Sequence, residues 1–168
     1  PVDYDSLKEV GAMMGSGGFV VMDEDTCMVD VAKYFLTFIQ NESCGKCVPC
    51  REGTKRLLEI VERIPESYKS SKNSERELMR FKGVIYLRRL AEVIKDSALC
   101  GLGQSAPNPV LSGLQYFKEE YEEHLYERKC RAGACKDLLT FSIDNSLCTG
   151  CGICARKCSA DAILGEKG

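Results

Sequence analysis

The segment at residues 42–53 decides the fold of this 168-residue chain, and it reads Glu42-Ser43-Cys44-Gly45-Lys46-Cys47-Val48-Pro49-Cys50-Arg51-Glu52-Gly53. Its three cysteines follow the spacing C-x2-C-x2-C. Three thiolates on one tight loop can hold three corners of a [4Fe–4S] cube, whose fourth iron then needs a distant ligand. Cys100 is the expected fourth ligand. A structural zinc site with four cysteine ligands is the plainer alternative, although such a site does not need its third thiolate so close in sequence.

Four amphipathic helices are predicted around this segment. Four amphipathic helices joined by short loops are most simply an up-down four-helix bundle, so the expected fold class is mainly α. The Cys44–Cys50 loop follows the first helix and Cys100 follows the third. In an up-down bundle these two junctions lie at the same end, which brings Cys100 to the other three cysteines. The apolar residues recur with helical period over 25–41, 51–64, 75–97 and 108–128, and the polar stretch 65–74 is expected to be a loop.

The helix starts and inward faces can also be predicted. Asp25 or Thr26 is expected to cap the first helix, and Asn108 is expected to cap the last, with Pro109 at its first position. The side chains expected to face the core include Leu36, Ile39, Leu57, Val61, Leu78, Ile85, Leu87, Leu114, Phe117 and Tyr121.

Short strands are predicted outside the helices. Gly15-Ser16-Gly17-Gly18 leads into the run 19–22, which predicts a turn followed by one strand. A phosphate-binding loop is disfavoured there, because the GK[ST] ending is absent and the glycines precede the strand. Residues 138–143 and 162–164 are predicted as two further strands. Since strand 19–22 has too few partners nearby, residues 1–22 are expected to be the last edge of a preceding β domain.

The charge balance disfavours two classes of partner. The chain carries 23 Lys and Arg against 25 Asp and Glu, a net charge of −2. Nucleic acids and anionic membranes both favour a basic surface, so neither is an expected partner. No apolar run approaches the roughly 20 residues of a membrane helix, and no secretory leader opens the chain, so a soluble, cytoplasmic protein is expected. Because Pro1 stands in place of a start methionine, the chain is expected to be a piece of something longer.

The cysteine usage indicates metal chemistry. The chain has 11 cysteines and one histidine. A disulfide framework normally uses an even number of cysteines in a secreted chain, whereas here the count is odd and the cysteines fall in tight groups. Tight groups with two-residue gaps suit a metal ion or cluster, which gathers several thiolates around one centre.

A second cysteine run, near the C-terminal end, has the spacing of a bacterial ferredoxin. Its four cysteines follow C-x2-C-x2-C-x3-C, and Gly150 and Gly152 are expected to take positive φ and to turn amides toward the sulfurs. In two-cluster ferredoxins the fourth cysteine serves the other cluster, and no second run is present. Ser159 also stands where a proline usually follows. Either a second half is missing or the fourth cysteine closes a single cluster; the run comprises Cys148, Cys151, Cys154 and Cys158.

The remaining three cysteines and the histidine form a third candidate site. His124, Cys130 and Cys135 have a plausible zinc spacing, and Cys27 begins the first helix. In the expected bundle, Cys27 and the end of the fourth helix share the end opposite the first cluster. A redox-silent zinc ion with three cysteine ligands and one histidine ligand is therefore predicted there. The alternatives are a buried free thiol beside a core or solvated histidine, and a Cys/His nucleophile pair, for which nothing supplies an oxyanion site.

Together with Cys100-Gly101-Leu102-Gly103, the segment 42–53 resembles the C-terminal part of the family of NADH-binding flavoprotein subunits. That family includes the flavin subunit of complex I and the beta subunit of NAD(H)-dependent, often electron-bifurcating, [FeFe]-hydrogenases. The resemblance covers nearly the whole chain, and the appended ferredoxin run favours the hydrogenase branch. Two departures are the long stretch between Cys50 and Cys100 and the missing second ferredoxin run.

The resemblance implies a function for each segment. Residues 1–22 would end a β-grasp domain, 23–129 would form the cluster-binding bundle and 141–168 a truncated ferredoxin-like α+β segment. The zinc-binding linker expected over 124–140 follows from the cysteine and histidine positions and not from the resemblance. Electrons would pass from FMN, reduced by NADH in a missing upstream domain, to the [4Fe–4S] cluster on Cys44, Cys47, Cys50 and Cys100. A second cluster would occupy the ferredoxin run. The implied partners are a hydrogenase-like catalytic subunit and a thioredoxin-like [2Fe–2S] subunit. A structural multi-zinc scaffold is the alternative function.

Overall fold

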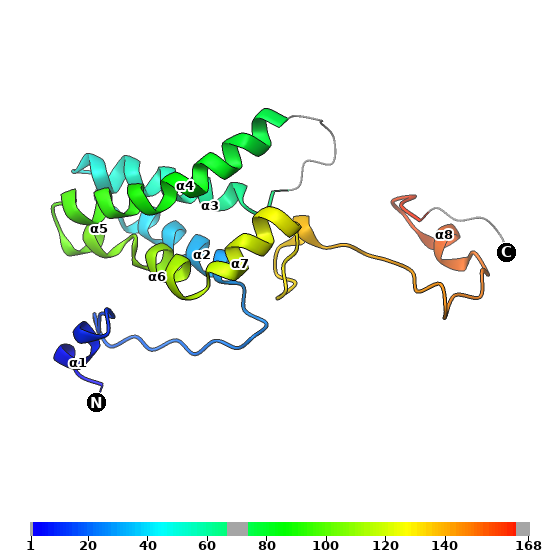
Figure 1. Cartoon of the computed structure of the whole chain (residues 1–168), viewed down its shortest axis with the longest axis horizontal. Coiled ribbons are helices and arrows are strands. Elements are labelled where there is room, and N and C mark those ends of the chain that lie inside the picture. The colour runs from blue at the N-terminus through cyan, green and yellow to red at the C-terminus, as the bar shows by residue number, and fades with distance from the viewer. Residues whose placement is uncertain (1, 67–73, 164–168) are drawn as a thin grey trace.

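The computed structural model describes residues 2–66 and 74–163, and within them the chain is mainly helical, with no β-strand. Four helices form its body: α2 (Met28–Glu42), α3 (Thr54–Arg63), α4 (Ser74–Ser97) and α6 (Asn108–Tyr116). Helix α2 packs on α3, α3 on α4, α4 on α6, and α6 on α2, so the four surround one core (Figure 1).

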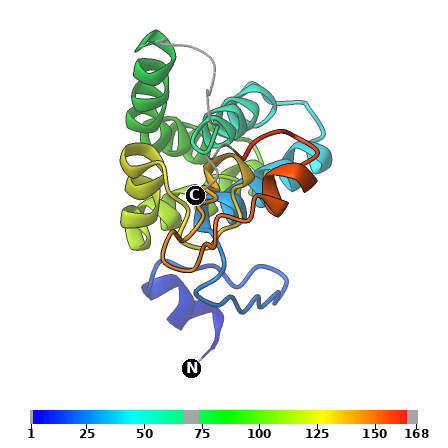
Figure 2. The ribbon, with the colours of Figure 1, turned by 90° about the vertical axis from the view of Figure 1, so that its right-hand side faces the viewer.

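Shorter elements lie at the two ends of this helical body. The π-helical turn η1 (Pro49–Gly53) and α5 (Gly101–Ser105) contact each other and α4 at one end. Toward the other end lie α7 (Lys118–Glu122) and the π-helical turn η2 (Glu123–Glu127) (Figure 1). The 3₁₀ turn η3 (Lys136–Leu138) follows. Helices α1 (Tyr4–Glu9) and α8 (Ile153–Lys157) lie outside the helical body: α1 lies below it in both views (Figure 2), and α8 is separated from it in the view of Figure 1.

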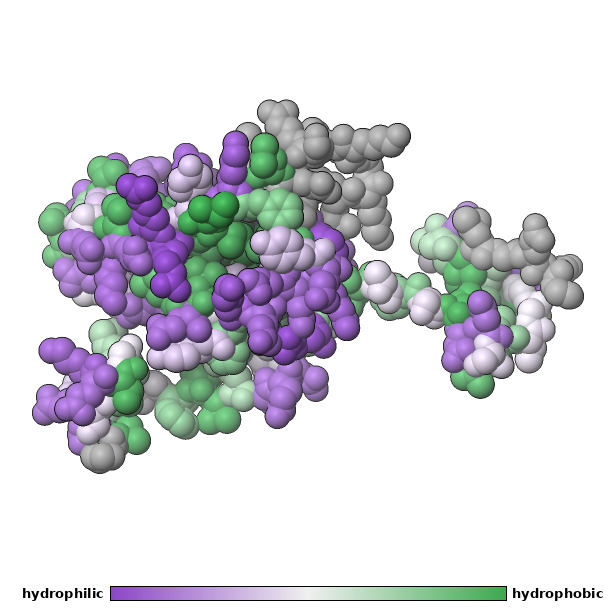
Figure 3. Space-filling model, in the orientation of Figure 1, coloured by the Kyte–Doolittle hydropathy of each residue, from purple (hydrophilic) through white to green (hydrophobic). Residues whose placement is uncertain are grey.

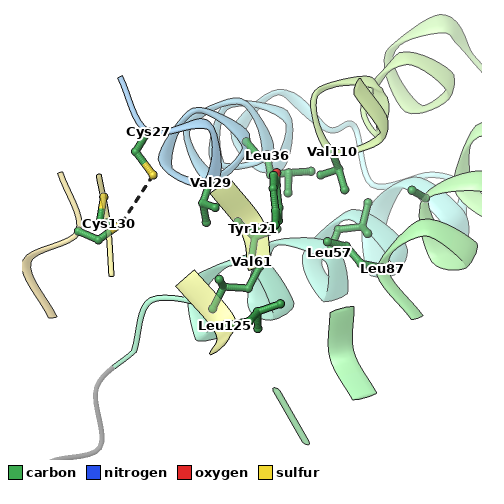
Figure 4. Close-up of a cluster of buried hydrophobic side chains, with 14 of the residues drawn as sticks. Cys27, Val29, Leu36, Leu57, Val61, Leu87, Val110, Tyr121, Leu125 and Cys130 are labelled. Carbon is green, nitrogen blue, oxygen red and sulfur yellow. Dashed lines mark hydrogen bonds between the residues drawn. The ribbon is translucent and has the colours of Figure 1, made fainter. Parts of the chain in front are cut away.

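The core is built from the facing stripes of these helices. Leu36 of α2, Leu57 and Val61 of α3, and Leu87 of α4 are fully buried, and Tyr121 of α7 lies among them (Figure 4). Each such aliphatic side chain contributes about 1.5–3 kcal/mol when it is removed from water, so this cluster holds the four helices together. Leu78, Ile85 and Phe117, which the sequence places inside, are exposed instead.

The cap predicted for the first helix is wrong. Helix α2 begins one residue after Cys27, and the Thr26 hydroxyl donates to the Asp23 carboxylate rather than accepting from the helix (2.9 Å). The Met28 amide is satisfied from α7, by the carboxylate of Glu120 (3.1 Å). A carboxylate at a helix N-terminus is favoured because the first amides there have no partners within the helix and carry partial positive charge. The cap therefore comes from a residue distant in sequence.

The single helix predicted over 108–128 is also wrong. Asn108 is the first helical residue rather than the cap, Pro109 follows it at the second position, and the helix ends at Tyr116. At Phe117 the backbone leaves the helical region (φ −127°, ψ 32°) before α7 begins. The break lets Tyr121 fold back over Gly113, where an added Cβ would lie only 2.8 Å from the Tyr121 hydroxyl.

None of the predicted strands forms within the described residues. Residues 19–22 are exposed and have no neighbouring strand, so a ladder of inter-strand hydrogen bonds cannot form. Leu138 is instead in η3, where its amide donates to the carbonyl of Cys135 (2.9 Å), and residues 139–143 have no regular structure. Residues 162–163 have none either, and residue 164 lies outside the described part. Most of the predicted loop at 65–74 also lies outside it.

The Tyr121 hydroxyl gives a stability prediction. Tyr121 is 1% exposed, and its oxygen has no hydrogen-bond partner among the described residues. Burial of an unsatisfied hydroxyl costs free energy, so we expect Tyr121→Phe to raise the free energy of unfolding by about 1 kcal/mol in chemical denaturation. Gly113→Ala is the matched opposite and should destabilise the fold. A clear loss of stability in Tyr121→Phe would mean that a water molecule satisfies the hydroxyl.

Candidate metal centres

The first cysteine group and Cys100 meet at one end of the helical body. Helix α2 ends at Glu42, and the loop that follows delivers Cys44, Cys47 and then Cys50 at the start of η1. The turn after α4 carries Leu99 and Cys100 to the same place, because α4 and α5 both contact η1. The sequence expectation that these two junctions share an end therefore agrees with the geometry. Cys50 is buried, Cys47 is half-buried, and both Cys44 and Cys100 are exposed.

Donor groups surround the sulfurs of this loop. The backbone amide of Leu99 and then that of Cys50 donate toward Cys47 and lower its pKa, which favours the thiolate. The hydroxyl of Ser43 lies 3.4 Å from Cys50 Sγ. Thiolates are the protonation state that binds metals and iron–sulfur clusters, so the amides near Cys47 favour its ligand form.

The loop itself is held in place by side chains that donate hydrogen bonds to its backbone carbonyls. Gly45 has a φ of 71°, a conformation that glycine adopts without strain. The guanidinium of Arg51 donates to the Gly45 carbonyl (2.6 Å) and so ties the start of the loop to η1. The hydroxyl of Thr54 donates to the Cys50 carbonyl (2.5 Å), and Gln40 of α2 donates to Thr54 in turn. These bonds fix the backbone that carries the cysteines.

Gly103 predicts how closely this end is packed. A Cβ at Gly103 would lie 2.7 Å from the Ala98 Cβ and 3.1 Å from the Cys50 Cβ, whereas a Cβ at Gly101 would meet nothing within 4 Å. We expect Gly103→Val to displace Cys50 and to lower iron content by at least about half, because close-packed atoms cannot be overlapped without movement. Gly101→Ala is the control and should bind iron normally. Equal iron in both variants would refute the packing argument.

The third candidate set comes together completely. Cys27, His124, Cys130 and Cys135 are all buried, and their four ligand atoms lie within 4.8 Å of one another. Cys27 Sγ lies 3.3 Å from His124 Nε2 and 3.8 Å from Cys135 Sγ, and Cys135 Sγ lies 3.4 Å from the same nitrogen. A zinc tetrahedron with bonds of about 2.0–2.3 Å has edges of about 3.5–3.8 Å, so these spacings fit zinc. Figure 4 shows the Cys27 sulfur turned toward the chain segment of Cys130.

Hydrogen bonds within this set shift the pKa values of three of its four residues. A hydrogen bond from Cys135 and the neighbouring His124 lower the pKa of Cys27 to about 4 despite its burial. Burial favours the neutral form of His124, but its bonds to Cys27 and to the Glu120 carbonyl outweigh this and raise its pKa to about 9. The bond to Cys27, together with burial, raises the pKa of Cys135. Without a metal, these shifts favour the thiolate form of Cys27 and the charged form of His124.

Glu120 supports both sides of this set. Its carboxylate accepts from the Met28 amide next to Cys27, and its backbone carbonyl lies 2.6 Å from Nδ1 of His124. A metal-bound histidine usually donates its other nitrogen to such an acceptor, which leaves Nε2 free to bind the metal. The set is also closed to substrates, since Cys27 is 2% exposed and His124 is 0% exposed. This burial argues against the nucleophile alternative.

The ferredoxin-type run forms a separate segment. Gly150 and Gly152 have φ values of 67° and 64°, as the sequence predicts, and α8 begins directly after them. The amide of Ala162 donates to Cys158 Sγ (3.4 Å), and this amide lowers the pKa of Cys158. The Ile153 amide has the same effect on Cys151. The first three cysteines of the run are exposed, and the segment lies apart from the helical body (Figure 3).

These features define a helical, cysteine-rich metal-binding protein. The chain belongs to the family described as "NADH-ubiquinone oxidoreductase-F iron-sulfur binding region", which matches residues 30–124. Residues 141–164 match a second family, described as "4Fe-4S binding domain". The chain is therefore an iron–sulfur-binding domain of the family of NADH-linked flavoprotein subunits, and its general role is electron transfer.

Several curated relatives are similar in sequence to this chain. The chain is 52% identical over 166 residues to the "NADP-reducing hydrogenase subunit HndC" of Solidesulfovibrio fructosivorans, covering 99% of the chain and 32% of that protein. It is 37% identical over 130 residues to an NADH-quinone oxidoreductase subunit of Streptomyces coelicolor, covering 77% of the chain and 27% of that protein. Another NADH-quinone oxidoreductase subunit, that of Rhizobium meliloti, is 36% identical over 129 residues, with coverage of 77% and 28%. The chain thus spans about a third or less of each relative.

Three contributors to the sites are not recognisable from the sequence. Ser43 and Glu120 act on the metal sites through contacts that depend on how the chain folds back. The adjacency of Ser43 to Cys44 is the only sequence signal for the first, and nothing in the helical pattern marks Glu120. Arg128 has a left-handed φ of 55°, and its guanidinium donates to the carbonyls of Ile64 (2.8 Å) and His124 (2.9 Å).

No helix among the described residues is long and apolar enough to cross a membrane.

Proposed function

We propose that this chain is the electron-transfer module of an NAD(H)-dependent [FeFe]-hydrogenase complex. Its role would be to pass electrons between FMN in an upstream part of the protein and clusters in partner subunits. The observation that carries this proposal is the meeting of the Cys44–Cys50 loop with the turn that bears Cys100. The backbone amides of Leu99 and Cys50 face the Cys47 sulfur there, and the Ser43 hydroxyl lies beside the Cys50 sulfur.

The hydrogenase branch is favoured by the extent of the similarity. The match with the hydrogenase subunit takes in 99% of the chain and so includes the ferredoxin-type run, whereas the quinone oxidoreductase relatives match 77%. The partners we propose are accordingly a hydrogenase-like catalytic subunit and a thioredoxin-like [2Fe–2S] subunit. The FMN and NAD(H) sites would lie in the upstream part, after which comes a β-grasp domain that ends with residues 1–22.

The residues of the bundle end would perform three tasks. Cys44, Cys47, Cys50 and Cys100 would hold a [4Fe–4S] cluster, which when bound stores and releases a single electron. Buried Cys50 anchors the inner side, while exposed Cys44 and Cys100 mark the side that partners can approach. The amide of Leu99 and the hydroxyl of Ser43 stabilise negative charge on the sulfurs. The surrounding helices α2, α3, α4 and α6 would constitute the four-helix bundle of the family.

The other two sites would complete the module. Cys27, His124, Cys130 and Cys135 would bind a zinc ion that ties the N-terminus of α2 to the linker 124–140. Zinc has no second oxidation state to use, so this role is structural. The run of Cys148, Cys151, Cys154 and Cys158 would bind a second [4Fe–4S] cluster in a ferredoxin-like segment over 141–168. Its fourth ligand would be Cys158 or a cysteine elsewhere in the longer protein.

Metal content tests this proposal directly. After anaerobic purification we expect about eight iron and one zinc per chain, with a visible absorption band that bleaches on reduction and an EPR signal from the reduced clusters. About four iron with one zinc would mean that only the bundle cluster is complete. Zinc without iron would overturn the electron-transfer function and leave the multi-zinc scaffold.

A further inference from the structure

Ser43 occupies a position that the cluster-ligand set does not explain. It lies at the C-terminus of α2, with an extended backbone (φ −66°, ψ 125°), directly before the cysteine loop. Its hydroxyl oxygen reaches across the loop to lie 3.4 Å from Cys50 Sγ, seven residues on. Cys50 is 5% exposed, so water competes little for its sulfur. A hydrogen bond in such a low-dielectric place is stronger than one at the surface.

The direction of this hydrogen bond follows from its surroundings. The amide of Gly45 donates to the Ser43 hydroxyl oxygen (3.3 Å), so that oxygen already serves as an acceptor. A cluster-bound cysteine is a thiolate and carries no hydrogen to donate. In a hydrogen bond between Ser43 Oγ and a cluster-bound Cys50 Sγ, the serine hydroxyl is therefore the only possible donor.

We propose that Ser43 raises the reduction potential of the [4Fe–4S] site by donating this hydrogen bond to Cys50 Sγ. The inference rests on the proposed function, because it requires a cluster on Cys50. Reduction adds one electron, and part of the added negative charge resides on the cysteine sulfurs. A donor to a sulfur then stabilises the reduced state more than the oxidised state, which moves the potential upward. Ser43 is thus a positioning and tuning residue that holds no metal itself.

Among the described side chains, Ser43 carries the hydroxyl whose removal tests the proposed hydrogen bond to the Cys50 sulfur. Thr54 also lies beside Cys50, but its hydroxyl donates to the Cys50 carbonyl and not to the sulfur. The donor at Cys47 is the backbone amide of Leu99, which a side-chain substitution leaves in place. Ser105 of α5 provides a matched control at the same end, because its hydroxyl donates to the Gly101 carbonyl (2.6 Å).

The experiment is a redox titration of the chain monitored by EPR, with iron content measured for each variant. We expect Ser43→Ala to retain its iron and to have a more negative midpoint potential. At the wild-type midpoint its oxidised-to-reduced ratio should rise by about three- to tenfold, the change that the loss of one ordinary hydrogen bond can produce. Ser43→Thr keeps a hydroxyl and should restore the wild-type potential, and Ser105→Ala should leave it unchanged.

Three other outcomes would overturn the inference. An unchanged potential in Ser43→Ala with full iron would mean that the hydroxyl does not act on the sulfur. Equal shifts in Ser43→Ala and Ser105→Ala would indicate a general effect of hydroxyl loss. Loss of iron in Ser43→Ala but not in Ser43→Thr would assign Ser43 to cluster assembly instead of tuning. Absence of iron from the wild-type chain is a different result, since it would refute the proposed function itself.

Discussion

Replacing Cys50 with alanine should remove about four iron per chain and abolish the EPR signal of the bundle cluster, while zinc content stays the same. Cys50 is the buried member of its set, and it lies in η1, which contacts α4 and α5. The three remaining cysteines would have to close a cube without the ligand that anchors its inner side. The measurement is iron and zinc content together with low-temperature EPR of the reduced protein.

Cys130→Ala is the reciprocal control for that experiment. It removes a member of the buried set near η2, and we expect it to lose zinc while keeping the EPR signal that Cys50→Ala loses. Cys50→Ser is a less clean substitution, because a serine oxygen can replace sulfur as a ligand. Full iron content in Cys50→Ala would contradict the assignment of the bundle cluster. Loss of zinc in the same variant would mean that the sites are not separate.

Cysteine spacing carried most of what the sequence could predict about the sites. Because the three cysteines of 44–50 are tied together by the chain, their proximity follows from spacing alone. The approach of Cys100 required a fold argument, and the helical period supplied it. A similar fold argument predicts that Cys27 lies close to His124, since Cys27 directly precedes α2 and His124 lies near the end of the last helical stretch. The geometry of that buried set agrees with the expected grouping.

The errors arose where tertiary contacts override local pattern. The apolar period runs through Phe117 without a break, yet the helix ends at Tyr116 and Tyr121 packs over Gly113. The neighbours His124 and Leu125 are both buried, and they lie in the π-helical turn η2, where the spacing of side chains differs from that of an α-helix. A pattern with a period of 3.6 residues cannot anticipate either departure. The Glu120 carboxylate at the start of α2 was missed for the same reason.

The strand predictions failed for a physical reason that composition hides. Residues 19–22 are rich in residues that favour strands, but a strand is stable only with a partner to complete its hydrogen bonds. Within residues 2–66 and 74–163 no partner strand is present. Of the run at 138–143, Leu138 lies instead in the turn η3, where its amide donates to the Cys135 carbonyl, and residues 139–143 have no regular structure.

Replacing His124 with alanine should abolish zinc binding and lower the free energy of unfolding by about 3–5 kcal/mol, without changing the EPR signal of the bundle cluster. The set joins Cys27, at the start of α2, to residues 130–135, which contain no α-helix. Without His124 the zinc ion loses one of its four ligands, so the free energy that zinc binding adds to folding is lost, and a cavity opens beside the Cys27 sulfur, which lies 3.3 Å from His124 Nε2. The measurements are zinc content, thermal denaturation followed by circular dichroism, and EPR of the reduced protein. A metal chelator applied to the wild-type chain should reproduce the loss of stability. Zinc retained at one per chain in His124→Ala would exclude the histidine as a ligand, and loss of the EPR signal would show that the two ends of the helical body are coupled.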